Sequence, residues 1–150
     1  MPILTGSIGP WGPAIHIKVM QTRHHVESLK KAGRPYSPPL VILGLIDTGA
    51  GMSALDVQVI SMLDLNPRGI VSIHTPSTGP AYENRQSYDA CFVLGENEAT
   101  SLVVNREVIG SEFASQGFFA LIGRDVLRYC RMVYDGPQDR FTLEYGHNES

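Results

Sequence analysis

The most constraining feature of the sequence is an apolar segment that runs directly into an acidic turn. The segment LVILGLI at residues 40–46 is followed without a spacer by DTGAG at residues 47–51. Apolar side chains on both faces predict a buried strand, and the acid, hydroxyl and glycines after it predict a sharp turn. A carboxylate at this place is expected to be partly buried where the strand ends. Asp47 is therefore the candidate reactive group, although the tripeptide alone is also compatible with a carboxylate that only caps the turn.

Short strands and turns are predicted for most of the remaining chain. Alternation over residues 14–20 predicts a half-buried strand. A capping box from Ser53 to Asp56 predicts a helix through residue 63, ended by NPRG at residues 66–69, and a second short helix is expected over residues 124–129. Further strands are expected at residues 70–75, 87–94, 101–104, 131–134 and 141–145, with a hairpin connection at residues 135–139.

The length and the turn-forming residues favour a single all-β domain spanning residues 1–150. The chain has 15 Gly and 10 Pro, an excess typical of turn-rich β proteins and unlike a helical bundle. Residues 1–13 are interpreted as a Gly/Pro-rich N-terminal arm and residues 21–39 as a polar loop insertion. Within that insertion, residues 26–32 have the pattern of one or two helical turns.

Composition also excludes several classes of partner. The net charge of −3 offers no general basic surface, so no nucleic acid is expected as a partner. No apolar run approaches the roughly 20 residues that span a bilayer, and the start lacks the features of a signal peptide, so no membrane association is expected. Cys91 and Cys130 are interpreted as reduced thiols, which favours a cytoplasmic location. The five histidines have no ligand spacing, so neither a metal nor a cofactor is expected.

Two motifs together resemble the retropepsin-like aspartic proteases. In that family an apolar strand enters Asp-Thr/Ser-Gly-Ala, a short helix follows, and a segment similar to LDLNPRG at residues 63–69 often ends it. A second family signature, apolar-apolar-Gly-Arg-Asp/Asn-x-Leu, is matched by ALIGRDVL at residues 120–127. With the closing hairpin around residues 132–143, the resemblance extends over residues 14–145.

This resemblance implies a retropepsin-like acid protease fold, a closed and twisted β-sheet domain with two short helices. It also implies an aspartic endopeptidase that hydrolyses peptide or protein substrates. The family's chemistry needs two aspartates, and the chain has one Asp-Thr-Gly, so a C2 homodimer is expected in which each subunit supplies Asp47. One Asp47 would activate a water and the other would protonate the scissile carbonyl.

Supporting roles are implied for the neighbouring residues. Thr48 matches the hydroxyl that hydrogen-bonds across the dimer axis, Gly49 matches the glycine whose carbonyl lies along the substrate, and Ala50 completes the turn. Two further groups match a substrate-covering flap and a structural segment beside the site: Thr75, Pro76, Ser77, Thr78 and Gly79 for the flap, and Gly123, Arg124 and Asp125 for the segment.

The chain departs from the family pattern at two places. Gly51 stands where the viral enzymes carry an acid that pairs with the Gly-Arg arginine, so Arg124 is expected to pair with Asp125 or another acid. Pro76 and Pro80 stiffen a flap tip that is usually glycine-rich. These departures leave a non-catalytic dimerisation or peptide-binding module on the same fold as the alternative. The Asp-Thr-Gly segment also loosely resembles the phosphate turn of actin-like ATPases, which need two large α/β lobes that this chain cannot supply.

Overall fold

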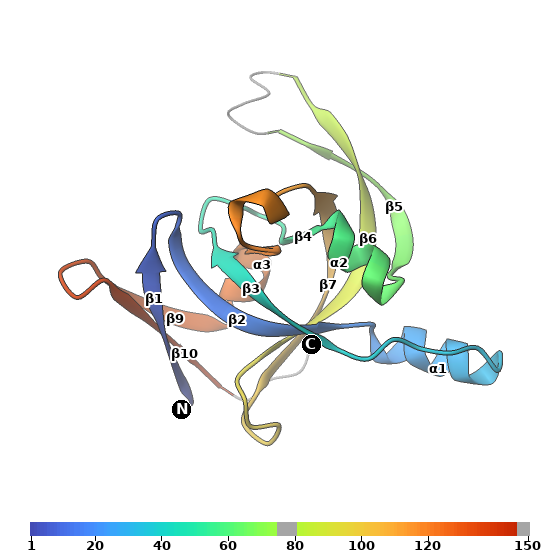
Figure 1. Ribbon diagram of the computed structural model, residues 1–150, viewed down its shortest axis with the longest axis horizontal. Helices are drawn as coiled ribbons and strands as arrows, with labels where there is room; N and C mark the ends of the chain where they lie inside the picture. Colours follow the sequence, from blue (N-terminus) through green and yellow to red (C-terminus); the bar gives the residue numbers. More distant parts are fainter. Residues whose placement is uncertain (75–80, 147–150) are drawn as a thin grey trace.

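The chain folds into a strongly twisted sheet whose central strands close on themselves (Figure 1). The computed structural model describes residues 1–74 and 81–146. Within those residues the strands are β1 (Ile3–Gly9), β2 (Gly12–Met20), β3 (Leu40–Ile46), β4 (Ala54–Asp56), β5 (Asn66–Ile73), β6 (Glu83–Leu94), β7 (Leu102–Ser111), β8 (Ala120–Ile122), β9 (Cys130–Asp135) and β10 (Arg140–Tyr145). The helices are α1 (Arg23–Lys31), α2 (Val57–Leu63) and α3 (Arg124–Leu127), with a 3-10 turn at Ala114–Gln116.

A closed barrel forms the body of the molecule. The sheet order is β5-β6-β7-β4-β8-β3-β2-β1-β10-β9, and an additional β6–β2 pairing joins β2, β3, β8, β4, β7 and β6 into a ring. Alternation in β2 sends Ile15, Ile17 and Val19 into the core, where the buried side chains of the other barrel strands meet them. Two extensions continue beyond the ring, the β5–β6 hairpin on one side and β1, β10 and β9 on the other.

Two strands far apart in sequence lie side by side in this barrel. The strand predicted at residues 40–46 is confirmed as β3, and it pairs in parallel with β8, with Gly44 opposite Ala120 and Ile46 opposite Ile122. A Cβ on Gly44 would lie 2.9 Å from Cδ1 of Ile122, so a larger residue at position 44 would require the Ile122 side chain to shift. Because parallel strands end at the same edge of a sheet, the segments after Ile46 and after Ile122 are neighbours.

The N-terminal arm and the polar loop contain more structure than the sequence indicated. Within the expected arm, β1 pairs with both β10 and β2, and the Phe141 ring occupies the space left by Gly6, where a Cβ would lie 2.5 Å from that ring. Within the expected loop, α1 begins three residues before the predicted turns because the Thr22 side chain accepts a hydrogen bond from His25 N (3.2 Å). α1 buries Leu29 and projects from the barrel (Figure 1).

The predicted start of α2 is wrong in detail. Residues 54–56 continue as β4, and Asp56 caps the helix, its Oδ1 accepting from Gln58 N at 2.9 Å. The helix ends at Asp64, which adopts the left-handed conformation (φ 47°), and the residues expected to end it instead begin β5. α3 is two residues shorter than predicted.

Most other strands are present but longer than predicted. β6 and β7 extend well beyond residues 87–94 and 101–104, while the hairpin connection at residues 135–139 is confirmed between β9 and β10. Cys91 and Cys130 are thiols and are not joined in a disulfide. In the part of the chain that the structure describes, none of the helices has the length and apolarity to cross a membrane.

Candidate active site

The Asp47 turn begins where β3 ends. Asp47 N donates to the carbonyl of Ile122 at the end of β8 (2.9 Å), which ties the first residue of the turn to the neighbouring strand. Gly49 N donates to Asp47 Oδ1 (2.9 Å) and Ala50 N donates to the Asp47 carbonyl (3.2 Å), so the turn closes over its own aspartate. The Asp47 side chain is half-buried, whereas Thr48 and Gly49 are exposed. The carboxylate is therefore presented at the surface by a hydrogen-bonded turn.

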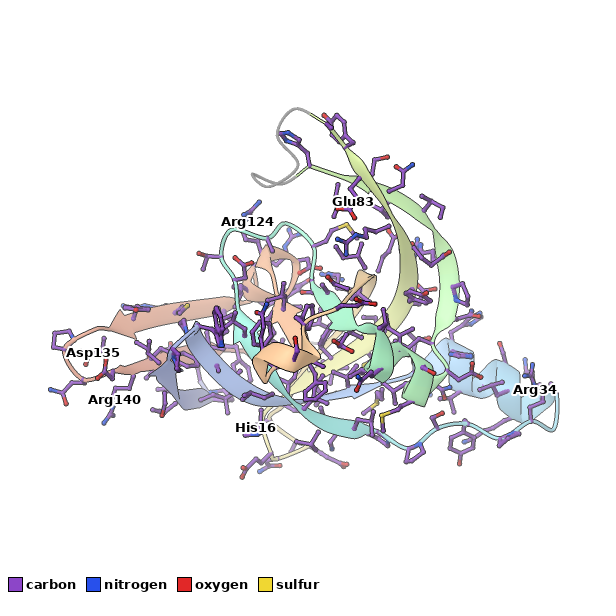
Figure 2. The ribbon with its side chains drawn as sticks, turned by 45° about the horizontal axis from the view of Figure 1, so that its top comes forward. His16, Arg34, Glu83, Arg124, Asp135 and Arg140 are labelled. Carbon is purple, nitrogen blue, oxygen red and sulfur yellow. The ribbon has the colours of Figure 1, made fainter. Side chains whose placement is uncertain are left out.

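The segment after β8 holds this turn from beside it. Arg124 N donates to the Ala50 carbonyl (2.8 Å), and Arg124 Nη1 donates to the Thr48 carbonyl (2.8 Å). Gly123 makes this approach possible, because a Cβ there would lie 2.8 Å from the Ala50 carbonyl oxygen. Figure 2 shows Arg124 beside the loop that follows β3. The two sequence motifs thus form one hydrogen-bonded unit.

Asp125 is held by a serine that the sequence analysis assigned to a helix cap. Ser53 N donates to Asp125 Oδ2 (3.0 Å), and Ser53 Oγ donates to Asp125 Oδ1 (2.6 Å). The same hydroxyl accepts from Gly123 N (2.9 Å), and Ser53 is fully buried. The sequence carried no signal for this role, because the partners lie about 70 residues away and a helix-capping pattern explained the serine locally.

The expected pairing of Arg124 with Asp125 or another acid is wrong. Both carboxylate oxygens of Asp125 bind Ser53, and within the described residues Arg124 forms no ion pair. A Cβ on Gly51 would lie 3.5 Å from Arg124 Nη2. Position 51, where the viral enzymes carry an acid, thus lies next to the Arg124 guanidinium. In this chain that guanidinium binds the Thr48 carbonyl instead.

The expected flap residues Thr75, Pro76, Ser77, Thr78 and Gly79 lie outside the described residues. The strands that lead to them form an antiparallel hairpin in which Ile73 is opposite Glu83. Beyond that pair, the rings of His74 and Tyr82 are 5.3 Å apart. This hairpin extends past the body of the barrel in Figure 1.

Metal-binding residues do not gather in the described ranges, 1–74 and 81–146, where no group of three or more His, Cys, Asp or Glu side chains could hold an ion. The Asp47 turn offers a carboxylate that can accept or donate a proton, and backbone N–H and C=O groups of the same turn lie beside it.

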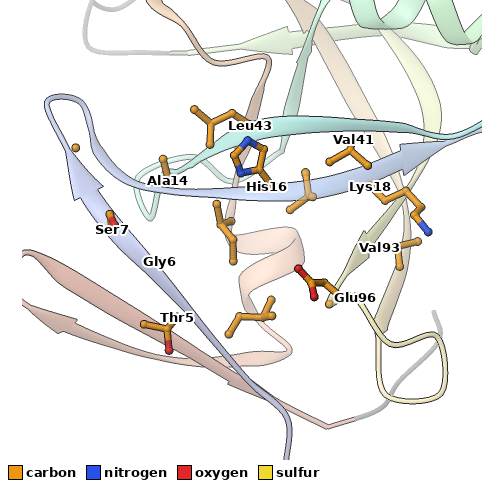
Figure 3. Close-up of a pocket in the computed structure, with 15 residues that line it drawn as sticks. Thr5, Gly6, Ser7, Ala14, His16, Lys18, Val41, Leu43, Val93 and Glu96 are labelled. Atoms are coloured by element: carbon orange, nitrogen blue, oxygen red, sulfur yellow. The ribbon is translucent and has the colours of Figure 1, made fainter.

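A separate groove of about 730 Å³ lies on another face of the molecule (Figure 3). It is lined by β1, β2, β3, the end of β6 and the start of the β6–β7 loop, including His16, Lys18 and Glu96, and Asp47 is not among its lining residues. His16 and Lys18 alternate with the buried Ile15 and Ile17, so they are the outward face of β2. This groove does not contribute to the Asp47 turn.

Comparison with known proteins identifies the fold. No family model matches the sequence, and no curated protein matches it. The structure, however, is similar to that of a retropepsin-like aspartic protease from Rickettsia conorii, with a TM-score of 0.58 and 14% identity over 97% of this chain and 92% of that chain. At this identity the similarity establishes the fold alone. The chain has a retropepsin-like, mostly β fold, as the sequence predicted.

Proposed function

We propose that this chain is one half of an aspartic endopeptidase, in which two copies each contribute Asp47. The observation that carries the proposal is the Asp-Thr-Gly turn at the end of β3, held by the Gly-Arg-Asp segment after β8 on a retropepsin-like fold. The chain contains one such turn, so a second copy is the direct source of the second carboxylate.

The chemistry follows from placing two carboxylates close together. Two such groups do not both ionise readily, so the pair holds one proton and its apparent pKa values belong to the pair. The ionised Asp47 removes a proton from a bound water, which attacks the scissile carbonyl while the protonated Asp47 gives its proton to the carbonyl oxygen. The tetrahedral intermediate then collapses as a proton passes to the leaving amine. No covalent bond to the enzyme forms.

An extended peptide or an unfolded protein segment suits this site as a substrate. Thr48 and Gly49 are exposed beside the carboxylate, and Gly49 has no side chain to keep a backbone away. Extended peptides bind through backbone hydrogen bonds, with side-chain pockets setting preference. We expect the β5–β6 hairpin to contribute the covering side of that site.

Digestion of a peptide library between about pH 4 and 8 tests the proposal. The wild-type chain is expected to cleave, and Asp47→Asn is expected to lose at least about 1,000-fold in rate, because an amide can neither accept the water proton nor share one. Asp64→Asn is the matched control, since Asp64 is exposed and its left-handed conformation suits asparagine. Equal cleavage by the wild-type chain and Asp47→Asn would exclude the proposed mechanism.

Arg124 supports a second candidate, a peptide-binding or dimerisation module without catalysis. Its guanidinium binds the Thr48 carbonyl, because residue 51 is glycine. The chain therefore lacks the substrate-binding carboxylate that the viral enzymes carry at this position. If the chain is such a module, we expect it to bind peptides without cleaving them at any pH, and we expect Asp47→Asn to leave that binding unchanged. The digestion above distinguishes the two functions.

A further inference from the structure

Arg124 carries a positive charge beside the Asp47 turn that no acid of the described residues balances. Its Nη1 donates to the Thr48 carbonyl (2.8 Å), and none of the ion pairs formed within residues 1–74 and 81–146 includes it. The adjacent acid, Asp125, binds Ser53 through both carboxylate oxygens. A guanidinium has five N–H donors in a planar fork, so Arg124 has further donors to offer an acceptor outside the described residues.

The space beside Gly51 can hold such an acceptor. A Cβ on Gly51 would lie 3.5 Å from Arg124 Nη2, and apart from the chain neighbours no other atom of the described residues would lie within 4 Å of it. Gly51 and Arg124 are both exposed, so the space opens to solvent. The glycine thus leaves a gap that has a guanidinium on one side.

The gap belongs to the same turn as the candidate reactive carboxylate. Ala50 N bonds back to the Asp47 carbonyl (3.2 Å), which makes the turn compact and keeps Gly51 close to Asp47. Arg124 is fixed to this turn at two points, because its N–H donates to the Ala50 carbonyl and its side chain donates to the Thr48 carbonyl. Figure 2 shows Arg124 beside this loop. A peptide bound at Asp47 would therefore pass the gap within a few residues of its scissile bond.

We propose that Arg124 binds an acidic side chain of the substrate, so that the enzyme prefers peptides with Asp or Glu at the position that faces Gly51. The inference deepens the proposed function and rests on it. A substrate carboxylate in the gap accepts N–H groups of the guanidinium, whose planar fork matches the two carboxylate oxygens. The substrate then supplies the negative charge that glycine at position 51 does not.

Two copies of the chain place one such arginine on each side of the scissile bond. The two-fold axis between the paired Asp47 residues carries Arg124 of one copy to the equivalent place along the other half of the substrate. We therefore expect the acid preference at two substrate positions, equally far from the scissile bond on its two sides. An arginine that only supports the turn would give no such preference.

Peptide-library profiling of the wild-type, Gly51→Asp and Gly51→Ala chains tests the inference. The wild-type chain is expected to cleave peptides with Glu at these positions with a kcat/KM about tenfold above that of the same peptides with Gln, and this ratio is expected to fall as salt is raised. Gly51→Asp is expected to abolish the ratio, because the new carboxylate pairs with Arg124 and repels a second acid.

Gly51→Ala is the matched control. It adds a Cβ in ordinary contact with the guanidinium but no charge, and it is expected to retain the ratio. Gly51 is not among the glycines with positive φ, so both substitutions suit its backbone.

Each ratio compares two peptides on one variant, so a change in overall activity cancels, and circular dichroism verifies folding. Equal kcat/KM for Glu and Gln peptides in the wild-type chain, a preference that Gly51→Asp leaves unchanged, or a preference that Gly51→Ala also removes would each overturn the inference.

Peptide binding separates this inference from the proposed function. Selection of bound peptides from the same library on the Asp47→Asn chain is expected to enrich Glu over Gln, and adding Gly51→Asp is expected to remove that enrichment. If acidic peptides are enriched in this way but cleavage does not depend on Asp47, the recognition by Arg124 stands and the protease proposal fails. If cleavage depends on Asp47 but shows no acid preference, the protease proposal stands and the inference fails.

Discussion

Ser53 shows how one buried hydroxyl supports the neighbouring Asp47 turn. It binds Asp125 as a donor and Gly123 as an acceptor, and these two residues flank the arginine that holds the Asp47 turn. Its own N–H adds a second bond to Asp125. The carboxylate of Asp125 is thus a structural acceptor, which distinguishes its role from that of Asp47.

Replacing Ser53 tests that support. Ser53→Ala is expected to lower the free energy of unfolding by about 1–3 kcal/mol, because Gly123 N and an Asp125 oxygen lose their partner in a buried setting. Urea denaturation measures the change, with Ser61→Ala on the exposed face of α2 as control. Equal midpoints for the two variants would contradict a supporting role for the hydroxyl.

At the scale of elements, Asp56 joins α2 to the loop after β7. The side chain is 2% exposed, and it accepts from Gln58 N, from Phe113 N (2.9 Å) and from Ala114 N (2.8 Å). Burial by itself would raise the pKa of Asp56, but the three backbone donors favour the charged form and bring the pKa below its ordinary value of 3.8.

The lowered pKa of Asp56 makes a prediction about acid stability. Ionised Asp56 stabilises the fold above the unfolded-state pKa, and this contribution is lost as the pH falls through the lower folded-state pKa. Asp56→Asn is expected to be about 1–3 kcal/mol less stable at pH 7 and to lose less stability on acidification than the wild-type chain. Urea midpoints from pH 7 to 3 measure this, and Asp139→Asn, an exposed control, should retain the wild-type slope.

Local patterns predicted the elements that depend on local chemistry. The bounds of β3 were predicted because seven apolar residues end at an acidic turn, and the β9–β10 turn because a polar Gly/Pro segment separates two apolar runs. β4 was missed because three residues carry no periodicity. The α2 cap was misassigned because Ser53 has a tertiary partner, Asp125, that no local pattern reveals.

The candidate site was predicted in its residues but not in its contacts. The two motifs indicated that Asp47 and Arg124 belong together, and the parallel pairing of β3 and β8 places them so. Arg124 binds the Thr48 carbonyl and not the expected acid. This partner depends on where the end of the long arginine side chain lies, which sequence spacing does not determine.

At the scale of the whole molecule, the proposal that activity requires two copies is testable by mixing chains. When equal amounts of wild-type and Asp47→Asn chains exchange freely, half of the wild-type chains pair with an inactive partner. Activity per wild-type chain is then expected to fall to about one half, provided that both carboxylates are required. Peptide cleavage after equilibration measures it, and mixing with Asp64→Asn should cause no loss. An unchanged activity in the Asp47→Asn mixture would mean that a single Asp47 is sufficient.

The pairing of β3 with β8 determines when the Asp47 turn gains its supporting contacts during synthesis. Asp47 is made early, but its backbone N–H bonds to Ile122 and its turn is held by Arg124, which emerge much later. Contacts of such long sequence separation form late in folding, because the intervening chain must first be ordered. For most of its time on the ribosome, the nascent chain therefore carries the acidic turn without the structure that holds it.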